Sequence, residues 1–241
     1  MPIWQELLVG VEMVALRASP VYWGISVPHG EGSAVVVLPG FLGSDFYLRE
    51  FRSWLRRIGY RPYVSNIGWN AECPNLLIQR RLREVMDTAF RETGRRIHLI
   101  GHSLGGVIAR AAATQMPDRV SSVITLGSPF MGLAAHPSIL RAAELVRKQI
   151  LERHGADVLP DCYTGACTCA FLESLATDLP DSVRATAVYT KADGIVWWEV
   201  CKCGDPEVDV EVNATHLGLV FNPNVYAIVA RRLAGAPARR E

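Results

Sequence analysis

One serine stands between a predicted buried strand and a predicted helix. Residues 97–100 are apolar, and Leu104–Gln115 is rich in alanine and aliphatic side chains, which predicts a strand followed by a helix. Between them lies Gly101-His102-Ser103-Leu104-Gly105, which fits the pattern G-x-S-x-G. In that pattern a sharp turn lifts the serine hydroxyl above the sheet, and the glycines give the turn clearance. We therefore predict that Ser103 is a nucleophile; a chance Gly-Ser loop is the alternative.

A serine hydroxyl is a useful nucleophile only when an imidazole takes its proton and a carboxylate orients that imidazole. Asp193 and His216 follow two predicted late strands, at 184–190 and 208–212. Because the carboxyl ends of parallel strands meet at one crevice, we expect Ser103, Asp193 and His216 to converge there. Their chain order, Ser then Asp then His, differs from that of chymotrypsin and of subtilisin. For Asp193 an ordinary Asp-Gly turn is the alternative.

The remaining histidines are weaker candidates for the base. His29 precedes the first clear strand, and His98 lies inside a buried strand. His102 occupies the variable position of the serine turn. His136 and His154 fall in a stretch without strands. Only His216 follows a late strand.

The developing negative charge on a reacting carbonyl needs hydrogen-bond donors. The predicted central strand Ala34–Leu38 runs into Pro39-Gly40-Phe41-Leu42-Gly43-Ser44, where glycines allow backbone N–H groups to turn inward. We expect the N–H groups of Phe41 and Leu104 to form the oxyanion hole. A plain glycine turn is the alternative. The expected substrate pocket is lined by Leu42, Phe130 and Met131.

Predicted strands and helices alternate along the chain. Beyond those already named, strands are predicted at 63–65 and 120–126. Helices are predicted at 46–58, from an N-cap at Asn75 to Gly94, and at 223–233. This alternation predicts an α/β fold with a mostly parallel, doubly wound sheet. A chain of 241 residues can form this as one domain, spanning 1–241.

A segment without predicted strands, residues 132–181, interrupts this alternation. It contains a long predicted helix, Pro137–His154, followed by a stretch rich in Cys, Asp and Gly. An insertion at this point would lie over the strand ends, and hence over Ser103, as a lid or cap. Apolar side chains of the helix face either the core or an acyl chain: Ile139, Leu140, Ala143, Val146, Ile150 and Leu151.

The N-terminus is predicted to form a helix that ends at Ser19-Pro20. Its apolar residues recur at helical spacing: Ile3, Trp4, Leu7, Leu8, Val11, Val14 and Ala15. We expect this helix to pack on the main domain. Attachment to a membrane surface is less favoured, because Glu6 and Glu12 lie on its polar side where anionic lipid would attract Lys or Arg.

The overall charge excludes one class of partner. The 25 basic and 24 acidic side chains leave a net charge of +1, so no nucleic-acid partner is expected. The first residues lack the basic region of a signal peptide, and no apolar run reaches the roughly 18 residues that span a bilayer. We expect a soluble protein. The cytoplasm is slightly favoured unless the cysteines form disulfides, and the oligomeric state is not predicted.

Several motifs together resemble those of the bacterial lipase/esterase branch of the α/β-hydrolase superfamily. The resemblance runs from about residue 34 to the C-terminus and rests on motifs in family order: 100–106, Leu38-Pro39-Gly40-Phe41, 125–130, Asp193-Gly194-Ile195-Val196 and 215–219. The absence of a long, strongly apolar lid and the number of cysteines depart from that branch.

This resemblance implies a serine carboxylic-ester hydrolase that acts on apolar acyl esters, including lipid or polymer esters. It implies an acyl-enzyme on Ser103, a Ser-His-Asp triad, oxyanion donors at Phe41 and Leu104, and no cofactor or metal. Transfer of the acyl group to another acceptor, or a non-catalytic binding module with a hydrolase-like fold, are the alternatives.

Six cysteines leave three interpretations open. Cys162, Cys167 and Cys169 fall in the predicted insertion, and Cys201 and Cys203 lie between Asp193 and His216, while Cys73 stands apart. Two C-x-C pairs could hold a structural zinc ion, although their spacing is unusual for zinc sites. Disulfides are favoured over metal and over reduced thiols. A Cys169–Cys201 disulfide would join the insertion to the loop that carries the acid and the base.

Overall fold

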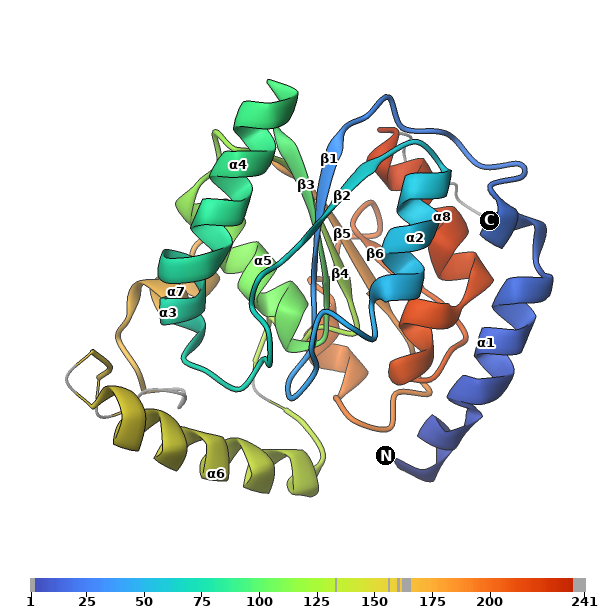
Figure 1. The fold of residues 1–241 in the computed structure, drawn as a ribbon. Helices are drawn as coiled ribbons and strands as arrows, with labels where there is room; N and C mark the ends of the chain where they lie inside the picture. Colours follow the sequence, from blue (N-terminus) through green and yellow to red (C-terminus); the bar gives the residue numbers. More distant parts are fainter. Residues whose placement is uncertain (1–2, 133, 156, 160, 162–165, 236–241) are drawn as a thin grey trace.

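The computed structural model describes residues 3–132, 134–155, 157–159, 161 and 166–235 (Figure 1). Six strands form one sheet in the order β2-β1-β3-β4-β5-β6, and every neighbouring pair is parallel. The strands are β1 (Ala34–Leu38), β2 (Arg61–Val64), β3 (Ile97–His102), β4 (Val120–Leu126), β5 (Arg184–Tyr189) and β6 (Asp209–Glu211). The predicted parallel, doubly wound sheet is confirmed.

Helices cover both faces of this sheet (Figure 1). One face is packed by α2 (Arg49–Arg57) and α8 (Pro223–Leu233), with the aromatic side chains of Phe51, Trp54 and Tyr226 in mutual contact. The other is packed by α4 (Arg83–Thr93), α5 (Leu104–Gln115) and α7 (Ala170–Ala176). Because both faces are buried, β1 is continuously apolar rather than alternating.

The boundaries of two helices differ from those predicted. The helix expected from residue 46 begins at Arg49 as α2. The helix expected to start at an Asn75 cap begins instead with α3 (Pro74–Leu77), with Cys73 at the cap position and proline in the first turn, because proline suits a position whose N–H has no partner within the helix. A π turn (Ile78–Leu82) joins α3 to α4, which ends at Gly94 as predicted.

The N-terminal helix (α1 in Figure 1) packs on the domain with the face opposite to the expected one. A 3-10 turn, η1 (Ile3–Leu8), leads into α1 (Val9–Ala18), and both contact the 3-10 turn η5 (Leu217–Phe221). Leu7, Val11 and Val14 are 84%, 66% and 69% exposed, whereas Glu6 is buried. The inward face carries glutamates because backbone N–H groups of the domain meet them there, as described below.

The predicted insertion separates into two parts. Helix α6 (Pro137–His154) lies beyond the ends of the strands at one side of the molecule, and α7 packs against α5 (Figure 1). Val146 and Ile150 of α6 are buried in a small apolar cluster with Leu76. A role of this segment as a lid stays a prediction.

The structure does not contain the disulfide that was favoured for the cysteines. Cys167, Cys169, Cys201 and Cys203 are free thiols in the structure, so the Cys169–Cys201 disulfide is not formed. Cys162 and residues 236–241 lie outside the described residues. In the described ranges, no group of three or more His, Cys, Asp or Glu side chains is arranged to hold a metal ion. Every helix there is too short or too polar to cross a bilayer.

The connections η2 (Pro20–Trp23) and η4 (Trp198–Cys201) complete the described elements. The first leads from α1 towards β1 and holds the indole N–H of Trp54 through the carbonyl of Val21 at 2.9 Å. The second lies between the loop that carries Asp193 and β6.

A histidine inside the central strand makes the fold sensitive to acid. His98 is buried in β3, and its Nδ1 lies 2.7 Å from the Ser122 hydroxyl. Burial lowers the pKa of His98 from 6.5 to about 4. Between these values the unfolded chain binds a proton that the folded chain does not, so stability falls as the pH drops below about 6.5.

We expect His98→Asn to lessen this loss. At pH 5 the linkage amounts to roughly 2 kcal/mol, so the fall in Tm from pH 7.5 to pH 5 should be smaller in the variant by about 4–8 °C. Calorimetry at the two pH values measures it, with the exposed His29→Asn as a control that keeps the wild-type fall. Equal falls in His98→Asn and wild type would contradict the prediction.

Candidate active site

Ser103 sits in a strained turn between β3 and α5. Its backbone has φ 53° and ψ −127°, a conformation that is costly for a residue with a side chain. An added Cβ on Gly101 would lie 2.3 Å from the backbone of Gly105, and one on Gly105 would lie 2.4 Å from the carbonyl oxygen of Leu38. Ser103 N–H donates to the carbonyl of Leu126 at 2.8 Å. The turn therefore needs both glycines, and the neighbouring strand holds its serine in place.

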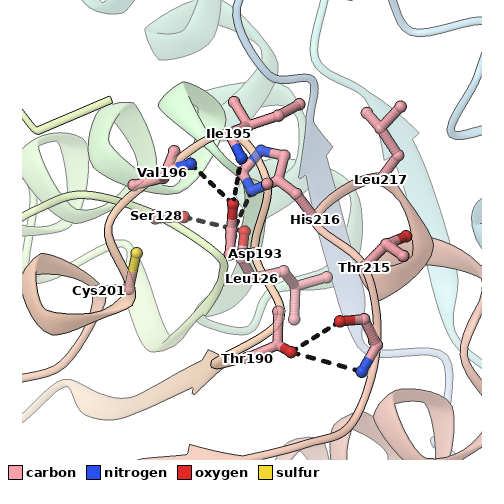
Figure 2. A network of polar contacts seen from close by, with 12 residues as sticks. Leu126, Ser128, Thr190, Asp193, Ile195, Val196, Cys201, Thr215, His216 and Leu217 are labelled. Carbon is pink, nitrogen blue, oxygen red and sulfur yellow. Dashed lines mark hydrogen bonds and ion pairs between the residues drawn. The ribbon is translucent and has the colours of Figure 1, made fainter. Parts of the chain in front are cut away.

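His216 and Asp193 form a buried pair from two different loops. His216 Nδ1 lies 2.6 Å from Asp193 Oδ2, and the two side chains are 2% and 1% exposed (Figure 2). The other carboxylate oxygen, Oδ1, accepts the N–H groups of Ile195 at 2.9 Å and Val196 at 2.7 Å. These donors offset the cost of burying the carboxylate. With Nδ1–H donated to Asp193, neutral His216 keeps the lone pair of Nε2 to accept a proton.

Thr190, directly after β5, joins the loop that carries Asp193 to the loop that carries His216. Its hydroxyl (Thr190 in Figure 2) donates to the carbonyl of Ala214 at 2.7 Å. It also accepts the N–H of Ala192 at 3.2 Å. One side chain thus bonds the backbone of Ala192, three residues after the end of β5, and the backbone of Ala214, two residues before His216. Thr190 therefore ties the loop that carries Asp193 to the loop that carries His216 close to the sheet.

Cys201, the thiol that Figure 2 draws near Asp193, is not a competing nucleophile. Burial and the negative charge of Asp193 raise the pKa of the Cys201 thiol. The thiolate is the nucleophilic form of cysteine, so Cys201 stays an unreactive thiol at neutral pH.

The loop after β1 passes close beside Ser103. A Cβ on Gly40 would lie 3.0 Å from Ser103 Cβ. The side-chain amide of Asn70 donates to the carbonyl of Pro39 at 2.8 Å, and the backbone of Asn70 bonds Leu42 and Gly43 at 2.9 Å and 2.8 Å. Leu42 has a positive φ of 56°. This bracing holds the Phe41 backbone next to the serine turn, where Leu104 begins α5 and its N–H has no carbonyl within the helix to bind.

His102 was expected to be no more than the variable residue of the serine turn, yet it connects the loop after β1 with His216. Tyr47 Oη accepts the N–H of Gly40 at 2.8 Å and donates to His102 Nδ1 at 2.9 Å, while His102 Nε2–H donates to the carbonyl of His216 at 2.9 Å. Burial and the nearby His216 imidazole lower the pKa of His102 to about 3. His102 is therefore neutral, as this relay requires.

A pocket of about 320 Å³ opens over these groups. Ser103 and His216 both line it, together with Phe41, Leu42 and Leu104. Apolar side chains of α6 form its far wall: Ile139, Leu140 and Ala143. A small, mostly apolar pocket with a few convergent polar groups is the usual form of a ligand site.

Of the three residues expected to line this pocket, the structure places Leu42 there. The loop after β4 contributes Pro129 instead of Phe130 and Met131. The Phe130 ring is buried with the Arg110 guanidinium 5.0 Å from its centre, and the Met131 side chain is 58% exposed. Periodicity predicts that a loop follows β4 but not the direction of each side chain in it. The sequence therefore could not show which of Pro129, Phe130 and Met131 faces the pocket.

Comparison with known proteins agrees with this architecture. The solved structure of carboxylesterase CesB from Bacillus subtilis covers 94% of this chain and 97% of its own, with a TM-score of 0.52 and 14% identity. The mature lipase BlEst2 from Bacillus licheniformis covers 87% of this chain and 94% of its own, with a TM-score of 0.56 and 15% identity. Likeness at these identities shows the α/β-hydrolase fold.

Sequence comparison finds a triacylglycerol lipase from Burkholderia plantarii that is 28% identical over 133 residues. This match covers 52% of the chain and 37% of the lipase, so the chain spans well under two thirds of that relative. The family model described as palmitoyl protein thioesterase matches residues 35–191, which are more than half of the chain. They include β1, the loop that follows it and the serine turn, and they end just before Asp193. The chain belongs to the palmitoyl protein thioesterase family.

Proposed function

We propose that this protein is a serine hydrolase that cleaves carboxylic esters of apolar acyl chains. The observation that carries the proposal is the buried His216–Asp193 hydrogen bond of 2.6 Å at the pocket that Ser103 also lines. Ser103, Asp193 and His216 are the catalytic residues in this proposal. The names of the lipase and carboxylesterase relatives support the same class of reaction.

The reaction follows from the roles of these groups. Ser103 Oγ attacks the carbonyl carbon while its proton passes to His216 Nε2, and Asp193 stabilises the imidazolium that forms. The N–H groups of Phe41 and Leu104 bind the oxyanion. The intermediate collapses to an acyl-enzyme as His216 protonates the leaving alcohol. Water then attacks the acyl-enzyme with His216 as base, and the acid is released.

The apolar wall of α6 favours the acyl part of the substrate over the alcohol part. A volume of about 320 Å³ is near the lower limit of ligand pockets, which favours short and medium acyl chains over palmitate. The family description names a thioesterase. Because the proposed steps are the same when a thiol leaves, matched oxygen esters and thioesters of one acyl chain belong in the same assay.

The nucleophile is tested with a fluorophosphonate probe and intact mass. We expect wild type to gain one adduct and to hydrolyse p-nitrophenyl esters, and Ser103→Ala to lose both while it keeps its fold. Ser128→Ala is the matched control, because Ser128 is also a buried serine after a strand but bonds only backbone carbonyls in the structure, those of Gly101 and Leu126.

Labelling or turnover in folded Ser103→Ala would contradict the assignment. A folded wild type that is neither labelled nor active would favour a non-catalytic binding module. An added alcohol that outcompetes water for the acyl group would instead identify an acyltransferase.

The pocket is tested by acyl chain length. While the acyl chain still fits, each added methylene should raise kcat/KM by roughly fourfold, since a buried methylene contributes about 0.8 kcal/mol. Activity should then fall for chains longer than the pocket. Ala143→Leu narrows the pocket and should shift the optimum to shorter esters. Ala142→Leu, one residue away on α6 and outside the described lining, should leave the optimum unchanged; an unchanged optimum in Ala143→Leu would exclude this wall as the acyl site.

A further inference from the structure

A buried glutamate of the N-terminal helix contacts the backbone of both loops that carry the proposed acid and base. Glu6 is only 7% exposed. Its Oε1 accepts the N–H of Gly194 at 3.0 Å and the N–H of His216 at 3.1 Å. Its Oε2 accepts the N–H of Leu217 at 2.8 Å. One carboxylate oxygen therefore joins the residue after Asp193 to His216 itself.

A second glutamate, two helical turns further along, holds the residue before the base. Glu12 Oε1 accepts the N–H of Thr215 at 3.0 Å, and Oε2 accepts its hydroxyl at 2.7 Å. The Thr215 hydroxyl in turn accepts the N–H of Gly218 at 2.9 Å. A Cβ on Gly218 would lie 1.7 Å from Glu12 Oε2, so this carboxylate packs where only glycine leaves room.

This arrangement accounts for the inverted face of the N-terminal helix. A carboxylate is costly to bury unless donors satisfy its oxygens, and here three consecutive N–H groups, of Thr215, His216 and Leu217, point at the two glutamates. The side chains of Leu7 and Val11 lie on the other face and are exposed, so their burial does not hold the helix on the domain. The polar contacts, with the buried side chain of Leu16, hold the helix on the domain.

We propose that Glu6 and Glu12 are positioning residues for the base, and that the N-terminal helix is part of the active-site assembly rather than a covering of the fold. Glu6 sets the distance between the Asp193 loop and the His216 loop, and Glu12 fixes the backbone immediately before His216. This inference rests on the proposed function, because positioning matters only if His216 acts as the base.

The two glutamates should respond differently to replacement by glutamine. Both oxygens of Glu6 accept N–H groups of the backbone, so the amide NH2 of Glu6→Gln would face a donor and no orientation satisfies the site. At Glu12 one partner is the Thr215 hydroxyl, which can accept from an amide NH2. Glutamine should therefore rescue much of the loss caused by alanine at position 12 but not at position 6.

Kinetics on a p-nitrophenyl ester test this. A misplaced reacting group can cost on the order of 100-fold, so we expect Glu6→Gln to lower kcat by about 10- to 100-fold with KM within about twofold of wild type. Glu12→Ala should lower kcat, and Glu12→Gln should lower it less. Gly218→Ala, which displaces the Glu12 carboxylate without changing Glu6, should also lower kcat.

Two controls separate positioning from general destabilisation. Leu7→Gln changes the adjacent, 84% exposed residue of the same helix and should keep wild-type kcat. Val85→Ala in α4, on the other face of the sheet, lowers Tm through lost packing and should also keep kcat. If kcat in the glutamate variants falls only as far as it does in Val85→Ala at a matched loss of Tm, the proposal is overturned.

Two measurements on the protein without substrate separate this proposal from the proposed function. Glu6→Gln should speed amide hydrogen exchange at Gly194, His216 and Leu217, and should weaken or shift the far-downfield proton resonance of His216 Nδ1–H. Unchanged exchange and an unchanged resonance would overturn the role of Glu6 whether or not the protein turns over esters. If Glu6→Gln changes both the amide exchange and the His216 resonance, but wild type is neither labelled nor active, the result would contradict the proposed function alone.

Discussion

The hydrogen bond between His216 Nδ1 and Asp193 Oδ2 is the interaction on which the rest of the site depends. The two atoms are 2.6 Å apart, and both side chains are almost fully buried although they come from separate loops. Removing one partner of a buried pair leaves the other unsatisfied, at a cost of several kcal/mol. The surrounding backbone reduces that cost by directing N–H groups at the carboxylate. The same carboxylate thus orients the His216 imidazole with one oxygen and is satisfied by backbone N–H groups at the other.

The loops that carry this pair have little regular structure of their own, so other elements must place them. Thr190 ties them together from the sheet, and His102 holds the carbonyl of His216 from the serine turn. Tyr47 extends that connection to Gly40 of the oxyanion loop. The loop of Gly40, the serine turn and His216 are therefore linked through neutral hydrogen bonds. Acid does not readily disrupt them, because burial lowers the pKa of His102 to about 3.

Much of this could be predicted from sequence because the signals are local. The β-branched run of β1, the glycines around Ser103 and the proline at the start of α8 each determine structure within a few residues. The positions of Asp193 and His216 followed from one further rule, that parallel strands end at one edge. That rule depends on topology rather than on side-chain packing, and the sheet obeys it.

What could not be predicted depends on contacts between distant segments. The N-terminal helix has an apolar stripe that indicates an inward face, yet Glu6 faces inward because N–H groups about 190 to 210 residues away meet it. No local pattern contains that information. The side chains after β4 were ambiguous for the same reason, since Phe130 turns towards Arg110 of another element. The disulfide expectation rested on counts and spacing, which do not determine whether two sulfur atoms meet.

The central claim is that Ser103, His216 and the N–H groups of Phe41 and Leu104 surround one reacting carbon. A crystal structure of the phosphonate adduct tests it most directly. We expect phosphorus bonded to Ser103 Oγ, its free oxygen about 2.7–3.1 Å from both backbone nitrogens, and His216 Nε2 facing the leaving-group side. A phosphorus atom on another residue, or an oxygen that points away from both N–H groups, would rule out this arrangement of the site.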